Sequence, residues 1–187
     1  QAVVEGFQGD DLSKPDCIAA CCKHYIGYGA SEGGRDYHKA EISDYTLRNY
    51  YLKAFKAAVD SGVQTVMNSF NEIGGQPTAS SHYLLTEVLR DELGFDGYVI
   101  SDWNAVSQLI EQGVAKDRKD AARLAINAGL DMDMVDDCYA DYGVELVKEG
   151  KIKMEVIDES VRRILRVKLR LGLFENPYVP RYKVDLE

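Results

Sequence analysis

The sequence lacks long apolar runs, paired cysteine motifs and phosphate-binding loops. No stretch of its 187 residues approaches the roughly 18 apolar residues of a membrane-spanning helix, so we expect no membrane span. The four cysteines show no Cys-x-x-Cys pair and no zinc-ligand spacing, and we interpret them as small buried apolar residues. Gly33-Gly34 lacks the Gly-Lys-Ser/Thr ending of a phosphate loop, and Asp131-x-Asp133 lacks the glycine of a calcium loop. We therefore expect no cofactor and no metal ion.

Basic residues are too few to suggest a polyanion-binding surface. The chain has 22 Lys and Arg against 31 Asp and Glu, a formal net charge of −9. Nucleic acids and anionic membranes both bind clusters of Lys and Arg, so neither is expected as a partner. The densest basic stretch, 162–170, alternates with apolar residues at helical spacing and predicts a solvated helix face.

Four strand-then-helix units follow one another along the chain. Apolar runs bounded by turn residues predict strands at about 17–25, 63–67, 98–101 and 130–134. Apolar residues at helical period predict helices at about 44–60, 80–93, 105–111, 117–128, 137–149 and 154–171. Since each helix carries the chain back across the sheet, the strands should be parallel.

These units fit a doubly wound open sheet or a (β/α)8 barrel. Four units make half a barrel, whose open strand edges are a poor place for a chain to stop. We therefore predict an α/β fold of the TIM-barrel type, in which residues 1–173 supply about four consecutive βα units and the other units precede Gln1. Residues 174–187 contain Pro177 and Pro180 without a strong period, and we expect a linker towards a missing C-terminal domain.

Polar side chains collect after each predicted strand. In chain order they include Lys23, His24, Arg35, Asn68, Ser69, Asn71, Asp102, Asp131 and Asp133, with Trp103 beside Asp102. If the strands are parallel, all of these residues face one rim, which is where α/β barrels keep their catalytic groups. Asp102 is the most informative of them because it directly follows a buried strand.

Each of these residues also has a purely structural interpretation. Asp102 could cap a helix that begins near Asn104. Lys23 could be an edge residue with a solvated ammonium, and His24 could be a hydrogen-bonded core histidine. Asp131 could orient a neighbouring side chain or cap the next helix. The combination at one rim favours a sugar site, because sugars need many directional hydrogen bonds and one flat apolar wall such as an indole.

Several segments together resemble glycoside hydrolase family 3. The sequences KHYIGYG at 23–29 and EGGRDY at 32–37 resemble the Lys-His motif of this family and the loop that follows it. VISDW at 99–103 is similar to its nucleophile strand, AGLDMDM at 128–134 to its next strand, and LGLF at 171–174 to the exit of its barrel domain. The resemblance covers the chain from about Gln1 to Tyr178, and bacterial multidomain β-glucosidases are the most similar members.

The resemblance implies a role for particular residues. Asp102 matches the catalytic nucleophile of the family. The substrate-binding residues that it implies are Lys23, His24, Arg35, Met67, Phe70 and Trp103. The first three would bind sugar hydroxyls in the −1 subsite, and the last three would line the pocket. Some relatives have a Tyr where Phe70 stands, and its hydroxyl would contact the nucleophile.

The implied activity is that of a retaining β-glycosidase. Such an enzyme would release terminal non-reducing β-D-glucosyl residues from a β-linked oligosaccharide or glycoside through a covalent glycosyl-aspartate on Asp102. The general acid/base of the family generally comes from a later domain, beyond Glu187. We therefore expect the remainder of the parent enzyme to be the chain's partner, and the isolated chain to be inactive. A periplasmic or secreted location is expected for the parent enzyme.

Two other interpretations are open at this point. A Schiff-base lyase could use Lys23 as its nucleophile in a barrel strand. A non-catalytic carbohydrate-binding homologue would keep Trp103 and Arg35 but would not need Asp102.

Overall fold

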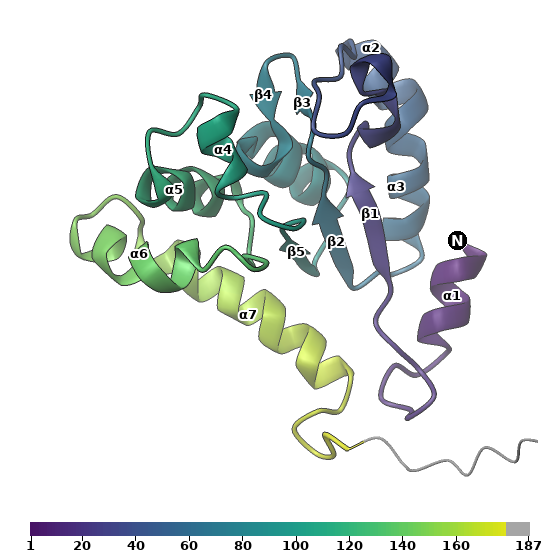
Figure 1. The fold of residues 1–187 in the computed structure, drawn as a ribbon. Coiled ribbons are helices and arrows are strands. Elements are labelled where there is room, and N and C mark those ends of the chain that lie inside the picture. The colour runs from purple at the N-terminus through teal and green to yellow at the C-terminus, as the bar shows by residue number, and fades with distance from the viewer. Residues whose placement is uncertain (179–187) are drawn as a thin grey trace, which may run out of the picture.

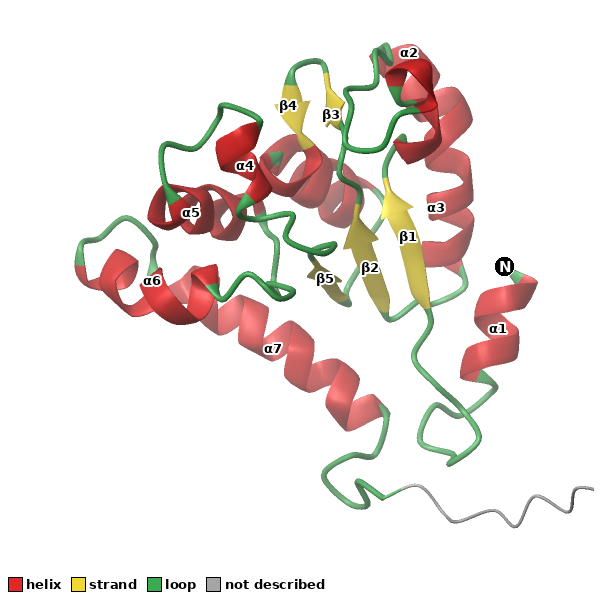
Figure 2. Cartoon of the chain, viewed as in Figure 1, coloured by secondary structure: helices red, strands yellow, loops and turns green. Residues whose placement is uncertain are grey.

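A three-stranded parallel sheet lies at the centre of the structure (Figure 1). The structure is a computed structural model, and it describes residues 1–178. Its strands β1 (Cys21–Tyr25), β2 (Thr65–Asn68) and β5 (Tyr98–Ile100) pair in the order β1-β2-β5. Both pairings are parallel, as the repeated units predicted. The arrowheads of β1 and β2 therefore point to the same side of the molecule (Figure 2).

Each helix expected from the sequence is present, with its ends shifted by a few residues. The helices are α1 (Ala2–Gln8), α2 (Asp44–Thr46), η3 (Leu47–Tyr51), α3 (Leu52–Asp60), η5 (Tyr83–Glu92), α4 (Gln108–Glu111), α5 (Arg118–Ala128), α6 (Cys138–Lys148) and α7 (Met154–Arg170). Of these, η3 and η5 are wound as π-helices. Short 3-10 turns lie at η1 (Tyr28–Ala30), η2 (Glu32–Gly34) and η4 (Thr78–Ser80).

Local side-chain chemistry explains several of these helix ends. The Ser43 hydroxyl accepts the Thr46 N–H at 3.2 Å and caps α2, and the Asp117 carboxylate accepts the Asp120 N–H at 2.8 Å and caps α5. Helix α5 ends at Gly129, whose φ of 98° is accessible to glycine. The predicted helix 105–111 is shorter and begins only at Gln108.

One face of the sheet is packed and the other is open. Val66 and Val99 are fully buried and belong to the hydrophobic core, which also includes Leu85 and Leu89 of η5. Met67 and Ile100 pair with each other on the opposite face and are only half-buried. Cys21 is exposed, so the prediction that all four cysteines are buried was wrong for this residue. Parallel sheets are normally covered on both faces, and within residues 1–178 the second face of this sheet is less covered than the first.

The predicted fourth strand is reduced to one parallel bridge, between Ile100 and Met132. The Asp131 side chain explains this: its Oδ2 accepts the Val99 N–H at 2.8 Å, in place of a main-chain carbonyl. The same carboxylate pairs with the guanidinium groups of Arg90 and Arg163. The prediction that Asp131 orients neighbouring groups was therefore correct, and the strand expected at 130–134 was not.

A β-hairpin that the sequence did not predict follows β2. It pairs β3 (Glu72–Ile73) with β4 (Gln76–Pro77) in antiparallel fashion. Its loop is Gly74-Gly75, and both residues have positive φ values of 59° and 78°, as a tight type I′ hairpin turn requires. The Ala40 N–H donates to Glu72 O at 2.8 Å, so the hairpin also anchors the long loop after β1.

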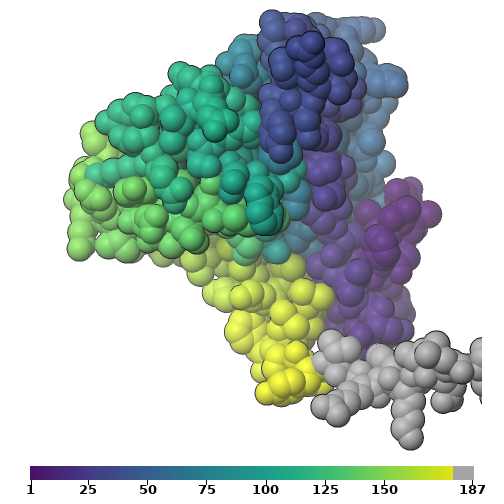
Figure 3. Space-filling model, viewed as in Figure 1, coloured from purple at the N-terminus to yellow at the C-terminus, as the bar shows by residue number. Residues whose placement is uncertain are grey.

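In the space-filling view the C-terminal part of the chain, in yellow, lies below the green and teal middle part and beside the purple N-terminal part (Figure 3). Within residues 1–178, no helix combines the length and the apolar character that a membrane crossing needs.

Candidate active site

His24 and Asp102 meet at the carboxyl edge of the sheet. His24 stands in β1 and Asp102 follows β5, and their side chains meet across the end of β2. His24 Nε2 lies 3.3 Å from Asp102 Oδ2, without the alignment of a hydrogen bond. Asp102 is 9% exposed. The sequence predicted a carboxylate at the carboxyl edge of parallel strands, and the structure places Asp102 there.

Asp102 is held at two points by neighbouring groups. Its main-chain N–H donates to Asn68 Oδ1 at 3.0 Å, and its Oδ1 accepts the Trp103 N–H at 2.7 Å. Its Oδ2 is buried and accepts no hydrogen bond from residues 1–178. One carboxylate oxygen is therefore fixed by a main-chain donor, and the other makes no hydrogen bond within the described residues.

The structure does not support a helix-capping role for Asp102. The main-chain amides of Val106 and Ser107, just before α4, both donate to Asp136 Oδ2 at 3.0 Å. Asp136 therefore supplies the acceptor that Asp102 would have supplied as a cap. The Asp102 carboxylate is therefore not used as the cap of α4.

His24 is favoured in its neutral form. Burial lowers the pKa of its imidazole, and this effect outweighs the nearby Asp102 carboxylate, which raises it. The ring packs against Tyr28, with ring centroids 4.9 Å apart. In the described part of the chain neither ring nitrogen makes a hydrogen bond, so His24 is not a satisfied core histidine. It can exchange hydrogen bonds with a ligand.

Aromatic rings continue from His24 along the rim. Tyr28 lies 6.1 Å from Phe70, and Phe70 lies 4.5 Å from Tyr37, measured between ring centroids. The Tyr28 hydroxyl donates to the Asp36 carboxylate, and this hydrogen bond is the main reason that the pKa of Tyr28 is raised to about 12. These contacts fix the loop that carries Tyr37 and Arg35 over the end of β2.

Trp103 offers an exposed indole next to Asp102. It is 59% exposed. A hollow of about 450 Å³ opens beside it, lined by Tyr37, Trp103, Asn104, Ser107, Gln108 and Glu111. Its lining pairs two aromatic rings with hydroxyl, amide and carboxylate groups, which is a typical composition for a carbohydrate-contacting surface.

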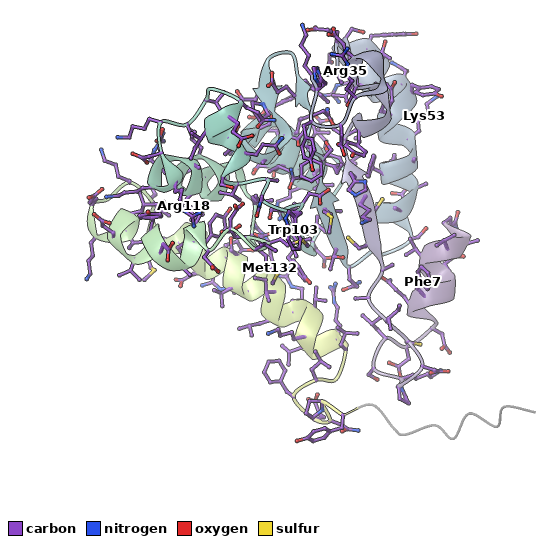
Figure 4. The ribbon with its side chains drawn as sticks, viewed as in Figure 1. Phe7, Arg35, Lys53, Trp103, Arg118 and Met132 are labelled. Carbon is purple, nitrogen blue, oxygen red and sulfur yellow. The ribbon has the colours of Figure 1, made fainter. Side chains whose placement is uncertain are left out.

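The other predicted substrate-binding residues do not contact Asp102. Lys23 and Arg35 are exposed, and within residues 1–178 neither makes an ion pair or a side-chain hydrogen bond. Arg35 lies at the upper edge of the molecule, well apart from Trp103 (Figure 4). Met67 lies on the open face of the sheet. The structure thus brings together Asp102, His24 and Trp103, and it leaves Lys23, Arg35 and Met67 facing open space.

Three residues of the site had no role assigned from the sequence. Asn68 was placed at the rim without a function, and Tyr28 and Asp136 were not considered as site residues. A polar Asn at the last position of an otherwise buried strand was the one available signal, because such a side chain needs a specific partner. The partners of Tyr28 and Asp136 depend on loop conformation, which no local pattern specifies.

Comparisons with known proteins show the family to which the chain belongs. A family model described as the glycosyl hydrolase family 3 N-terminal domain matches residues 1–167. The chain is 40% identical over 178 residues to a periplasmic β-glucosidase of Salmonella typhimurium, covering 95% of the chain and 23% of that relative. It is 41% identical over 181 residues to a putative β-xylosidase of Formosa agariphila, covering 94% of the chain and 24% of that relative.

A solved structure shares the fold over the full chain. The β-glucosidase of Listeria innocua in complex with glucose matches with a TM-score of 0.94 and 41% identity, covering 100% of this chain and 26% of that one. The chain spans about a quarter of the length of these relatives. On the match of residues 1–167, the chain belongs to glycosyl hydrolase family 3, within the N-terminal domain of that family.

Proposed function

We propose that this chain carries the nucleophile of a retaining β-glycosidase that acts on β-D-glucosides. The observation that supports this most directly is the Asp102 carboxylate. Its Oδ1 accepts the Trp103 amide, and its Oδ2 lies 3.3 Å from His24 Nε2 and makes no hydrogen bond within residues 1–178. Relatives in Salmonella typhimurium and Listeria innocua are named β-glucosidases, and these names support a terminal glucosyl residue as the substrate of this protein.

The reaction would run in two successive displacements at the anomeric carbon, from opposite faces of the sugar. Asp102 attacks the anomeric carbon, a C–O bond to the carboxylate forms, and the bond to the leaving oxygen breaks as a general acid protonates that oxygen. Water then gives a proton to the conjugate base of that general acid, attacks the same carbon, and releases the carboxylate as the C–O bond to Asp102 breaks. In a retaining enzyme the two carboxyl groups lie roughly 5 Å apart. We propose that the second carboxyl comes from a part of the protein outside these 187 residues.

The sugar would be bound by residues around Asp102. Neutral His24 can accept or donate a hydrogen bond at a hydroxyl without neutralising Asp102. The Lys23 and Arg35 side chains are exposed and unpaired in the described residues, so they are available to bind further hydroxyls. Trp103 offers the flat wall, and Met67 and Phe70 would line the apolar side of the pocket.

We also propose that residues 1–173 supply about four consecutive βα units of a (β/α)8 barrel, and that 174–187 lead towards a further domain. The open sheet face at Cys21, Met67 and Ile100 supports this, because further strands would cover it as a barrel interior. The partner of the chain is then the remainder of the parent enzyme. The relative named as periplasmic supports a periplasmic or secreted location.

Neither alternative gains support from the site. A Schiff-base lysine is usually desolvated in an apolar pocket, whereas Lys23 is exposed in the described structure. A carbohydrate-binding homologue has no need for a buried carboxylate with one unbonded oxygen.

The stereochemistry of the first product tests the proposal. The full-length protein is mixed with an aryl β-glucoside, and the released glucose is followed by proton NMR. We expect β-glucose to appear first and α-glucose only later, by mutarotation. Initial release of α-glucose would contradict the double displacement, and an absence of turnover with aryl β-glucosides and β-xylosides would contradict the glycosidase assignment.

A further inference from the structure

The Asn68 side chain makes the hydrogen bond that follows the last main-chain pair between β2 and β5. The main-chain pairing of these strands ends at Met67 and Ile100. Beyond it, the Asn68 carboxamide takes over, and its Oδ1 accepts the Asp102 N–H at 3.0 Å. Asn68 is fully buried. The amide of the proposed nucleophile is therefore paired by a side chain and not by the sheet.

The orientation of the Asn68 side chain is fixed by a buried polar network. Its Nδ2 donates to Ser69 O at 2.7 Å and to Thr78 Oγ1 at 3.3 Å, so its oxygen must face Asp102. Ser69 in turn donates through its hydroxyl to Ile26 O at 3.1 Å and through its amide to Tyr25 O at 2.6 Å. The network thus ties the position of Asp102 to the end of β1, the strand that carries His24.

The Asn68 and Trp103 contacts together leave one carboxylate oxygen of Asp102 for chemistry. Asn68 holds the Asp102 main chain, and the Trp103 amide holds Oδ1, so Oδ2 is the oxygen without a hydrogen bond among the described residues. We propose that Asn68 is a positioning residue, which fixes the Asp102 peptide so that Oδ2 points at the anomeric carbon. This inference rests on the proposed glycosidase function.

The expected cost of losing Asn68 follows from geometry. Asp102 lies outside the main-chain pairing, so without Asn68 its buried amide has no acceptor and the peptide can rotate to find one. A displacement of about 1 Å at a reacting atom can slow a reaction by on the order of 100-fold. Substrate affinity should change little, because Asn68 is buried beneath the rim and does not face a ligand.

The first experiment measures the attack step directly in the full-length protein. The probe is a 2-deoxy-2-fluoro-β-glucosyl fluoride, which traps the glycosyl-enzyme and yields a trapping rate constant and a binding constant. We expect Asn68→Leu to lower the trapping rate constant by about 10- to 100-fold, with a binding constant within about threefold of wild type. The Ser side chain of Asn68→Ser is too short to reach the Asp102 amide, so this variant should show the same loss. It replaces the Leu variant in the experiment if the Leu variant does not fold.

Asn71→Leu is the matched control. Asn71 is also fully buried at this rim, and its Nδ2 contacts Ile26 O and Glu72 O at 3.3 and 3.4 Å, but it makes no bond to Asp102. We expect its trapping rate constant to stay within about threefold of wild type. Equal losses in the Asn68 and Asn71 variants would overturn the proposal, as would an Asn68→Leu rate constant within threefold of wild type.

A second experiment separates positioning from general disruption of the rim. In an Asp102→Ala background, azide can attack the anomeric carbon of 2,4-dinitrophenyl β-glucoside, forming a C–N bond as the dinitrophenolate leaves with the C–O electron pair. With no carboxylate left to position, adding Asn68→Leu should not change this azide-dependent rate by more than about threefold. A further 10-fold loss would overturn the proposal. If the wild-type protein neither turns over the glucoside nor is trapped, the proposed function fails instead.

Discussion

Asp133 and Asp136 are two carboxylates in one loop with opposite surroundings. Asp136 accepts the amides of Val106 and Ser107 and the Ser107 hydroxyl. Asp133 Oδ1 is buried and accepts no hydrogen bond from the described residues, and burial raises the pKa of the Asp133 carboxyl. The negative charge of Asp136 is therefore stabilised by three hydrogen bonds, whereas that of Asp133 is destabilised by burial.

Asp133→Asn should stabilise the protein at neutral pH. A raised pKa means that the native state favours the protonated carboxyl, so stability is lost as pH rises through that pKa and the full cost is present at pH 7. A neutral amide removes this cost and can still accept the Tyr139 N–H through its oxygen. Thermal unfolding of the full-length protein should show a Tm rise of about 2 °C at pH 7, which shrinks towards pH 3.

Asp136→Asn is the contrasting variant. It removes a charged acceptor from three hydrogen bonds and should lower the free energy of unfolding by about 1–3 kcal/mol. A Tm that falls in the Asp133 variant, or a gain of equal size in both, would contradict this description of the loop.

Among the strands and helices, the packing of the last βα unit depends on one buried ionic cluster. The Asp131 carboxylate is fully buried, pairs with Arg90 of η5 and Arg163 of α7, and accepts the Val99 amide of β5. It thus joins elements that are far apart in sequence. Removing one member of such a cluster leaves the others buried and uncompensated.

Asp131→Ala should therefore destabilise the protein by about 3–5 kcal/mol in chemical denaturation. Arg162→Gln provides the control: Arg162 stands next to Arg163 on α7 but forms an exposed pair with Glu159. Its loss should change the unfolding free energy by less than about 1 kcal/mol. Similar effects of the two substitutions would show that the cluster does not hold these elements together.

These same elements show where prediction from sequence succeeds. The helices and the first three strands were predictable, because their apolar residues repeat with a helical or strand period. The strand at 130–134 was not, because the Val99 N–H donates to the Asp131 side chain and not to a main-chain carbonyl. His24 and Asp102 were identified by their positions at the ends of predicted parallel strands. The role of Asn68 depends on strand register, which brings it to a partner 34 residues away.

At the scale of the whole molecule, one face of the sheet is partly exposed, and residues 1–178 surround the candidate site on one side only. Met67 and Ile100 are half-buried and Cys21 is exposed on that face, and the polar rim above it is open at Lys23 and Arg35. Relatives of known fold are about four times as long. Both the cover of the sheet and the second carboxyl of the reaction would then come from outside these 187 residues.

The isolated 187-residue chain should therefore show no appreciable turnover of an aryl β-glucoside, whereas the full-length protein should turn it over. We also expect the isolated chain to bind an apolar dye such as ANS, because its open sheet face presents apolar surface to water. Comparable turnover by the two proteins would show that the site is complete within this chain.

Peptide mapping after trapping tests the assignment of Asp102 most directly. The full-length protein is inactivated with 2-deoxy-2-fluoro-β-glucosyl fluoride, digested, and the labelled peptide is identified by tandem mass spectrometry. We predict one fluoroglucosyl group on the Asp102 side chain, and no label in Asp102→Ala. A label on another carboxylate of an active protein would contradict the function proposed for this site.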